Sequence, residues 1–276
     1  MRFWWMALGG LALVAGAAAH AGEGRLEINQ ACVATGCFAG DAPGLPVTIT
    51  EPGGYVLTSA LTGSAAGAIS ASVAGVHLDL NGFEISGPGS CSATLGGDGK
   101  LVSVACTGTA GTGVNGVESV RDGTIRGFGS GITPSSLAPA RIERVTVRET
   151  SSDAIAGSGR RLILTDSVIS TSAGDGVGGQ SSTAIFTVRG CVFERNEEAL
   201  YLANGIVTES VFIENDEALR SNVGGSALVV NNSFHRNVSA LSGSSPRYRS
   251  NVFEETTNAL GGTNLGSNVC DGNPCP

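Results

Sequence analysis

Four segments in the C-terminal half of the chain repeat one pattern: GCVFERNEEAL (190–200), ESVFIENDEAL (209–219), NNSFHRNVSAL (231–241) and SNVFEETTNAL (250–260). Three earlier segments follow it with smaller residues: DGTIRGFGSGI (122–132), RVTVRETSSDAI (144–155) and DSVISTSAGDGV (166–177). The apolar residue at the centre of each copy recurs in steps of 19 to 24 residues, at Ile125, Val147, Ile169, Phe193, Phe212, Phe234 and Phe253. A period near 20 residues predicts a solenoid of stacked coils.

Each repeat has three apolar positions, which polar residues, glycine or serine separate. The first lies five residues before the central one, at Val120, Ile142, Leu164, Val188, Val207, Val229 and Tyr248. The third is an aliphatic residue that follows a small one, at Ile132, Ile155, Val177, Leu200, Leu219, Leu241 and Leu260. Many of these residues are β-branched or aromatic, which favours strands. Three short strands per coil, with a rise of about 4.8 Å, predict an all-β fold with a core of three apolar columns.

Short polar side chains flank the central column. Three residues after it stand Thr150, Ser172, Asn196, Asn215, Asn237 and Thr256, and two residues before it stand Ser210, Asn232 and Asn251. At a bend such side chains bond the local backbone, and identical amides one coil apart can bond each other. The alternative is that they are ordinary loop residues facing solvent.

The termini depart from the repeat. Residues 1–21 predict a secretory signal peptide, with Arg2, an apolar run over 3–19 and a small-residue cleavage site, so the protein is expected to be periplasmic or secreted. The run is too short to span a bilayer comfortably, and no membrane span is expected after its removal. Residues 22–61 predict an N-terminal cap, 62–260 the parallel coils, and 261–276 a C-terminal cap.

The first complete coil is VHLDLNGFEISG (76–87), in which Ile85 occupies the place of Ile125. The forty-residue step between these two residues predicts that they lie two coils apart. Residues 88–112 are rich in glycine and serine and contain two cysteines, which predicts a loop that protrudes from the stack. The whole solenoid is expected to contain about nine or ten coils.

Charge argues against two classes of partner. The chain has 16 Lys and Arg against 24 Asp and Glu, a net charge of −8 at neutral pH. Lys100 is the single lysine and no basic patch is present. Neither nucleic acid nor an anionic membrane surface is therefore expected as a partner, and the pattern leaves the oligomeric state open.

The cysteines favour disulfides, because seven of them occur in a chain that is expected to be exported. Proximity in sequence predicts three pairs: Cys32–Cys37, Cys91–Cys106 and Cys270–Cys275. Cys191 is left over, in a column that also holds Ser167 and Ser210. It is expected to face inward as an unreactive free thiol, and the alternative is a nucleophile.

Carboxylates stand just before the small residue of four coils, at Asp153, Asp175, Glu198 and Glu217, with Glu197 and Asp216 beside the last two. In register, neighbours lie about 5 Å apart. At that distance they repel by about 3 kcal/mol per pair if the effective dielectric constant is near 20. A bound calcium ion would offset this repulsion, which makes calcium the candidate cofactor, and the alternative is that the side chains splay into water.

Two outward columns carry charges of both signs. Two residues after the central column the order is Glu149, Thr171, Arg195, Glu214, Arg236 and Glu255, which predicts a surface ladder of ion pairs. The column one residue after the centre supplies the catalytic candidates Arg148, Glu194, His235 and Glu254. In that column Glu194 could act with His235 or Glu254 as acid and base.

Three motifs carry a family resemblance: LDLNGFEISGPGSC (78–91), VRDGTIRGFGSGI (120–132) and the N-x-F-x-x-N-x-x-A-L pattern of the later coils. With them the chain resembles the secreted bacterial right-handed parallel β-helix repeat proteins of the pectate-lyase-like superfold. The resemblance implies a right-handed parallel β-helix over most of the mature chain. It implies little about function, because such proteins include lyases, hydrolases and adhesins.

Two functions are compatible with these patterns. The first is an exported binding or structural protein without a recognisable active site, whose strand faces and 88–112 loop meet polysaccharide or a cell-surface component. The second is a polysaccharide lyase or glycoside hydrolase that acts on acidic polysaccharide with calcium. The chain has no Asp-Asp pair and no Gly-His-Gly motif, and both tryptophans, Trp4 and Trp5, leave with the signal peptide. These features favour the first function.

Overall fold

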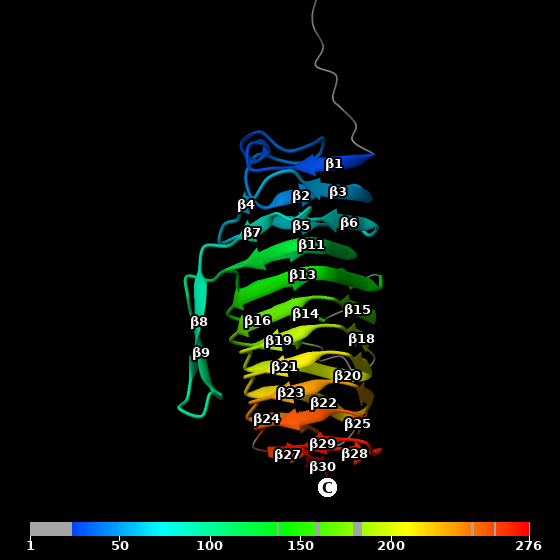
Figure 1. The fold of residues 1–276 in the computed structure, drawn as a ribbon. Coiled ribbons are helices and arrows are strands. Elements are labelled where there is room, and N and C mark those ends of the chain that lie inside the picture. The colour runs from blue at the N-terminus through cyan, green and yellow to red at the C-terminus, as the bar shows by residue number, and fades with distance from the viewer. Residues whose placement is uncertain are drawn as a thin grey trace, which may run out of the picture.

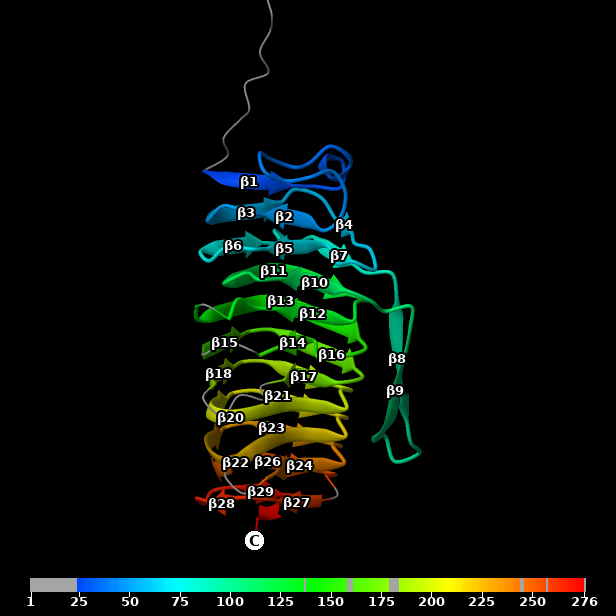
Figure 2. The ribbon, with the colours of Figure 1, turned by 180° about the vertical axis from the view of Figure 1, so that it is seen from behind.

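The structure is a computed structural model that describes residues 24–136, 138–157, 161–178, 184–243, 246–256 and 258–275, without the side chains of 222–224, 258 and 259. The predicted signal peptide lies outside this part of the chain. The described residues form a parallel β-solenoid of about nine turns, in which each coil lies on the previous one (Figures 1 and 2). The predicted right-handed parallel β-helix is confirmed.

Strands stack on three faces. Face A contains β1 (Arg25–Ile28), β3 (Gly53–Leu57), β6 (Val76–Asp79), β15 (Arg161–Thr165), β18 (Ile185–Arg189), β25 (Pro246–Arg249) and β28 (Thr263–Asn264). Face B contains β4 (Leu61–Thr62), β7 (Glu84–Ser86), β16 (Val168–Ser172), β19 (Val192–Glu194), β21 (Val211–Ile213), β23 (Ser233–His235), β26 (Val252–Glu254) and β29 (Val269–Cys270). Face C contains β2 (Val47–Ile49), β5 (Ile69–Ala71), β10 (Thr112–Asn115), β12 (Ser130–Thr133), β14 (Ile155–Ala156), β17 (Asp175–Gly178), β24 (Ser239–Ser242) and β27 (Asn258–Leu260).

Four longer strands turn a corner and so serve two faces. Faces A and B share β11 (Ser119–Arg126) and β13 (Ala140–Thr150), and faces C and A share β20 (Glu198–Thr208) and β22 (Glu217–Val230). The remaining elements are a short 3-10 helix η1 (Cys32–Ala34), the strands β8 (Ser90–Leu95) and β9 (Leu101–Thr107), and β30 (Asn273–Pro274). In the described residues, no helix is long and apolar enough to cross a membrane.

The three predicted apolar columns are confirmed, one for each face. Val120 pairs with Ile142 on face A, Phe193 with Phe212 on face B, and Leu200 with Leu219 on face C. On face B the rings of Phe193, Phe212, Phe234 and Phe253 stack with centroids 4.9, 4.8 and 4.8 Å apart and interplanar angles of 5°, 6° and 15°. One coil could not bury such a ring alone, so neighbouring coils depend on each other.

The stacked asparagines also form as predicted. Asn196 Nδ2 donates to Asn215 Oδ1 at 3.1 Å, and Asn215 Nδ2 donates to Asn237 Oδ1 at 2.9 Å. These three residues are fully buried, so they are not solvent-facing loop residues. A second ladder joins Asn232 and Asn251 and continues to Asn268, beyond the predicted column. Each ladder satisfies buried backbone groups at a bend where the strand pairing ends.

Residues 88–112 leave the stack as an antiparallel hairpin of β8 and β9, which runs down the side of the solenoid (Figures 1 and 2). Its tip reaches far down the stack, since Gly99 lies against the side chain of Arg236. Because this excursion uses up the intervening residues, Ile85 pairs directly with Ile125. The prediction that these two residues lie two coils apart was wrong for that reason.

The three predicted disulfides are present: Cys32–Cys37, Cys91–Cys106 and Cys270–Cys275. They lie near the two ends of the solenoid and across the hairpin. Parallel pairing already begins within the segment predicted as the N-terminal cap, where β1 pairs with β3. At the other end β29 pairs with β26 and then turns back into β30.

Candidate functional site

A hollow of about 280 Å³ lies at the corner where face C turns into face A in the N-terminal coils. We call it the hydroxyl hollow, and its lining is Ala71, Ser72, Val73, Asn115, Gly116, Thr133, Pro134, Ser135 and Ser136. Its lining side chains carry hydroxyl and amide groups or are small and apolar, and none is charged. Such a surface can exchange hydrogen bonds with a neutral polar ligand.

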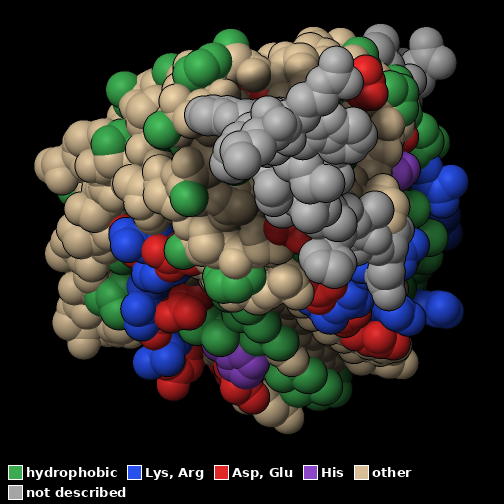
Figure 3. Space-filling model, turned by 90° about the horizontal axis from the view of Figure 1, so that it is seen from above, with side chains coloured by type: hydrophobic (Ala, Val, Ile, Leu, Met, Phe, Trp, Pro, Cys, Tyr) green, Lys and Arg blue, Asp and Glu red, His purple; other side chains and the backbone are tan. Residues whose placement is uncertain are grey.

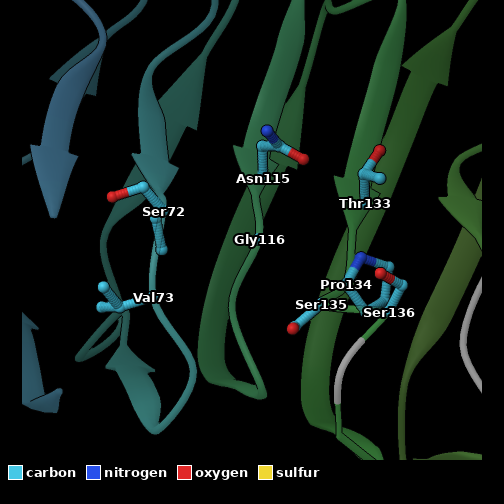
Figure 4. A pocket seen from close by; sticks show the side chains of 9 residues that line it. Ser72, Val73, Asn115, Gly116, Thr133, Pro134, Ser135 and Ser136 are labelled. Carbon is cyan, nitrogen blue, oxygen red and sulfur yellow. The ribbon is translucent and has the colours of Figure 1, made fainter. Parts of the chain in front are cut away.

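Three neighbouring coils build this hollow. Asn115 pairs with Thr133 at the ends of β10 and β12, and Ser72 comes from the coil before, directly after β5 (Figure 4). Gly116 adopts a φ of 77°, and a β-carbon at this position would collide with the carbonyl oxygen of Ala71. The glycine therefore lets two turns approach closely, and this approach shapes the floor of the hollow.

The sequence contains a weak signal for this hollow. Asn115 and Thr133 directly follow the aliphatic residues Val114 and Ile132 on face C. The approach of Ser72 to the same hollow could not be predicted without the exact path of the chain through the hairpin, because 43 residues separate Ser72 from Asn115.

The predicted catalytic residues meet only in part. His235 Nδ1 lies 3.0 Å from Glu254 Oε2, one coil away. Glu194 is separated from His235 by the coil that carries Ile213, and it pairs instead with Arg195. His235 and Glu254 are 35% and 52% exposed, and neither lines the hydroxyl hollow, so the pair lies on an open face.

The fourth candidate, Arg148, belongs to a different group of charges. Its guanidinium contacts Glu149 at 2.7 Å and Glu84 at 3.6 Å, and Arg126 also binds Glu84 at 2.8 Å. In register, Arg148 lies two coils from Glu194 and four coils from His235. The four candidates do not form one constellation, and their catalytic roles stay a prediction.

The predicted ion-pair ladder exists, with one difference. Arg195 and Arg236 contact the two carboxylate oxygens of Glu214 at 2.8 and 2.9 Å. Glu214 is 4% exposed, so its carboxylate is buried between the two guanidinium groups rather than at the surface. A buried carboxylate needs such partners because its desolvation is otherwise costly. This part of the ladder supports the fold.

The acidic residues of face C form a row. In register, Asp175 pairs with Glu198 and Glu198 with Glu217, and Asp153 Oδ1 accepts a long hydrogen bond of 3.4 Å from the Asp175 amide. Arg220 lies 3.5 Å from Glu198 and 3.8 Å from Glu217, and its guanidinium sits over the Tyr201 ring. The row is half-buried, and Glu198 Oε1 is buried without a hydrogen-bond partner in the described residues.

Burial raises the pKa values along this row. Burial and the charge of Asp153 raise the pKa of Asp175 to about 6. Burial, followed by the charges of Asp175 and Glu217, raises the pKa of Glu198 to about 8. The pKa values of Asp153, Glu197 and Glu217 are also raised, mainly by burial. The row is therefore partly protonated at neutral pH, which reduces its internal repulsion.

The calcium prediction gains no support from this geometry. The carboxylates follow one another at strand spacing instead of surrounding a common centre, and a protonated carboxyl group is a poor ligand for calcium. Within the part of the chain that the structure describes, no group of three or more His, Cys, Asp or Glu is arranged to hold a metal ion.

Cys191 is a free and buried thiol, as predicted. Its Sγ lies 3.3 Å from the Arg189 carbonyl oxygen, and its backbone amide donates to Ser210 Oγ at 3.2 Å. Burial raises the pKa of the thiol to about 11, so it is not a thiolate at neutral pH. The geometry gives no support to a nucleophilic role.

Comparison with known proteins places the chain in a family. No curated protein and no solved structure matches it. Residues 108–273 match the NosD family, described as periplasmic copper-binding protein, and this segment is more than half of the chain. It runs from β10 to the last coil, and the family's description supports the predicted location outside the cytoplasm. The chain therefore belongs to the periplasmic NosD family of β-helix proteins.

Proposed function

We propose that this protein binds glycans outside the cytoplasm, and that the hydroxyl hollow holds a short neutral stretch of the sugar chain. The observation that carries the proposal is that Ser72, Asn115 and Thr133, from three neighbouring coils, line one hollow. Strand stacking places Asn115 and Thr133, which pair in register, about 4.8 Å apart. A sugar ring also offers hydroxyl groups at short and regular intervals, so several hydrogen bonds can form at once.

The apolar part of the lining supports the same ligand class. Val73 and Pro134 lie among the polar side chains of the hollow and can contact the C–H groups of a sugar ring. A volume of about 280 Å³ lies at the low end of the range of ligand pockets, which suits a single ring or a short oligosaccharide segment. An uncharged lining disfavours highly charged ligands at this hollow.

The copper named in the family's description fits the described residues poorly. Copper prefers imidazole, thiolate and thioether ligands. The two histidines that the structure describes, His77 and His235, lie on β6 and β23, many coils apart, and Cys191 is a buried thiol with a raised pKa. Both methionines of the chain, Met1 and Met6, lie outside the described residues. The described residues thus do not gather the donors of a copper centre.

The enzyme alternative rests on the contact of His235 with Glu254, at 3.0 Å. A lyase or hydrolase would need this pair beside a bound sugar chain, yet the pair lies on an open face of the C-terminal coils. Binding is the better-supported function for that reason. Calcium dependence belongs to the enzyme alternative and is tested with it.

A melting scan of the mature protein against neutral and acidic oligosaccharides, with and without calcium or copper, tests the proposal. We expect a neutral oligosaccharide to raise the melting temperature, because a ligand that binds only the folded state stabilises it. Absorbance of unsaturated products in the same wells reports lyase activity.

Thr133→Val removes one hydroxyl of the hollow and keeps the shape of the side chain. We expect it to weaken sugar binding about fivefold to tenfold, the cost of one neutral hydrogen bond. Thr187→Val on β18 makes the same change outside the hollow and should bind like the wild type. Equal binding by both variants, or no stabilisation by any sugar, would contradict the proposal.

A further inference from the structure

Face A of the later coils carries a group of exposed arginines. The strands concerned are β15, β18, the C-terminal parts of β20 and β22, and β25, which stack along one side of the solenoid (Figures 1 and 2). We call their outward side chains the arginine face. Its cationic members are Arg161, Arg189, Arg247 and Arg249, and all four are exposed.

Strand pairing arranges the outward positions of this face in three columns. In order, the columns are Arg161, Ile185, Asn204 and Ser226; Ile163, Thr187, Ile206, Leu228 and Arg247; and Thr165, Arg189, Thr208, Val230 and Arg249. No Asp or Glu occupies any of these positions. Asp166 and Glu209 directly follow β15 and β20, at the bends where the chain leaves face A.

The four guanidinium groups are not neutralised. None of them forms an ion pair or a hydrogen bond with the residues that the structure describes. Elsewhere, basic and acidic side chains gather in mixed clusters at the rim of the solenoid (Figure 3). Arg121 and Arg144, for example, both contact Asp122. A protein with a net charge of −8 therefore presents one sheet face whose charges are all positive.

The centre of the arginine face is aliphatic. Ile185 and Ile206 are 50% and 46% exposed and lie on the neighbouring strands β18 and β20. Ile163 and Leu228 extend this area on β15 and β22, in the column of Ile206. Exposed apolar side chains at neighbouring positions, with a polar rim, are typical of surfaces that contact a protein or a membrane.

The spacing of the arginines separates these two kinds of partner. Stacked strands lie about 4.8 Å apart, so Arg189 and Arg249, three coils apart in one column, are about 14 Å apart. A protein partner would need acidic groups at matching positions, whereas a leaflet of anionic phospholipids presents phosphates across a whole plane. Charges of one sign on a flat sheet fit the leaflet better. A second copy of this chain is disfavoured, because two arginine faces would repel each other.

We propose that the arginine face docks on an anionic phospholipid surface outside the cytoplasm. The guanidinium groups bind lipid phosphates through paired N–H donors, and Ile185 and Ile206 contact the boundary between head groups and acyl chains. Acids on the other faces oppose this attraction only in part, because salt screens charges over about 8 to 10 Å. The periplasmic location that the family's description supports brings the protein close to membranes.

This docking departs from the expectation drawn from the sequence, where the lack of a basic run argued against an anionic membrane surface. The four arginines come from three strands, and 88 residues separate Arg161 from Arg249. Only the register of the coils brings them to one face. Docking is independent of the sugar proposed for the hydroxyl hollow, which lies in earlier coils.

Flotation of the mature protein with vesicles tests the proposal. We expect binding to vesicles of phosphatidylcholine mixed with phosphatidylglycerol, weaker binding at high salt, and little binding to phosphatidylcholine alone. Arg189→Gln combined with Arg249→Gln should weaken binding about twentyfold to thirtyfold, at about fivefold per arginine. Ile206→Ser should weaken it about fivefold, because apolar contact with the lipid is lost.

Lys100→Gln combined with Arg126→Gln is the matched control. It removes two positive charges from the hairpin tip and from face B, and should bind vesicles like the wild type. Equal losses in this control and in the variant of Arg189 and Arg249 would show that only net charge matters and would overturn the proposal. No binding to the phosphatidylglycerol vesicles would overturn it as well.

Polyglutamate in place of the vesicles tests the other kind of partner. If it binds with the same dependence on Arg189 and Arg249 while the vesicles do not bind, the face takes an acidic protein and the membrane proposal is wrong. Thr133→Val should bind vesicles like the wild type, so a failure of the sugar proposal does not decide this one. A circular-dichroism melt of each variant shows whether it is folded.

Discussion

The C-terminal coils, from β19 to β29, and the N-terminal coils, from β1 to β12, follow the same three-strand plan but differ in regularity. The C-terminal coils repeat after 17, 19 or 22 residues and stack identical side chains, as in the Phe column and the two Asn ladders. The N-terminal coils stack unlike residues, such as Arg25, Gly54, His77 and Ser119 in one column. The hydroxyl hollow and the space beside Gly54 both lie among these irregular coils.

The difference concerns how each half fills the space between its coils. A column of identical side chains fills its space evenly and satisfies its own hydrogen bonds, which stabilises the stack. A column of unlike side chains leaves gaps where a small residue follows a large one, as at Gly54. We infer that columns of identical side chains mainly support the fold and that ligand sites form where unlike side chains stack.

The largest expected effect comes from breaking the regular half at its aromatic column. Phe212→Ala should lower the free energy of unfolding by about 3 to 5 kcal/mol, because it leaves a cavity in the core. The variant also loses the ring stacking of Phe212 with its two neighbours, Phe193 and Phe234. Urea denaturation followed by circular dichroism measures the change.

Phe128 in the N-terminal coils is the matched control for this variant. It is equally buried, with 0% exposure, and makes no ring stack among the described residues. Phe128→Ala should therefore cost less than Phe212→Ala by about 1 to 2 kcal/mol, the contribution of two aromatic pairs. Equal losses would mean that the aromatic column adds nothing beyond burial.

The second prediction tests the asparagine ladder. Asn215→Ala removes the donor to the Phe193 carbonyl oxygen at 3.0 Å and the acceptor of the Asn196 amide at 3.0 Å. Because these groups are buried, we expect a loss of about 2 to 4 kcal/mol. Thr150→Ala, in the same column but with one side-chain bond to Ser172 at 3.0 Å, should cost about 1 kcal/mol. The same urea titration compares both, and similar losses would contradict a special role for the ladder.

Periodicity explains how much of this structure could be predicted. Side chains that recur with the repeat, such as Phe212 and Asn215, share a column in any solenoid with the same period, so their stacking follows from spacing alone. The pairing of Ile85 with Ile125 did not follow from spacing, because the sequence does not show how many of the residues between them belong to the hairpin and how many to a coil.

The candidate site was harder to predict than the fold. The hydroxyl hollow depends on which unlike residues become neighbours, and Ser72 and Asn115 meet there although 43 residues separate them in the sequence. The burial of Glu214 depends in the same way on three-dimensional context, since its spacing is that of an exposed ladder position. Of the predicted catalytic residues, only His235 and Glu254 contact each other.

The third prediction concerns the acidic row of face C, in which stacked carboxylates repel one another. Glu198 has a pKa of about 8 in the folded protein, above its ordinary value of 4.5. Folding thus favours the protonated form of Glu198. The stability that this protonation contributes is fully present below the pKa of Glu198 in the unfolded state, and it is lost as the pH rises through 8. Asp175, with a pKa of about 6, acts in the same direction at lower pH.

Thermal unfolding between pH 5 and pH 9 tests this row. We expect the wild type to lose stability as the pH rises, and Glu198→Gln to be more stable than the wild type at pH 9 by an amount of order 2 kcal/mol. The two proteins should unfold alike at pH 5, where Glu198 is neutral. Glu254→Gln, an exposed change, is the control. An unchanged pH dependence in Glu198→Gln would show that another group is responsible.

The smallest expected effect tests whether the regular columns tolerate an equivalent residue. Cys191 occupies the column of Ser167 and Ser210, whose hydroxyls donate to the carbonyl oxygens of Thr165 and Thr208 at 2.8 and 2.9 Å. Cys191 Sγ has the corresponding contact with the Arg189 carbonyl oxygen at 3.3 Å. Cys191→Ser therefore replaces a weak hydrogen bond with a stronger one and loses some apolar packing.

We expect these two changes nearly to cancel, so that the free energy of unfolding of Cys191→Ser differs from that of the wild type by less than about 1 kcal/mol. Cys191→Leu, which adds volume at the same buried site, should be clearly less stable. Native Cys191 should also resist thiol reagents until the protein unfolds, since the thiol is buried and its pKa is raised. Rapid labelling of the folded protein would show that this column opens, and the C-terminal coils would then be less rigid than their stacking implies.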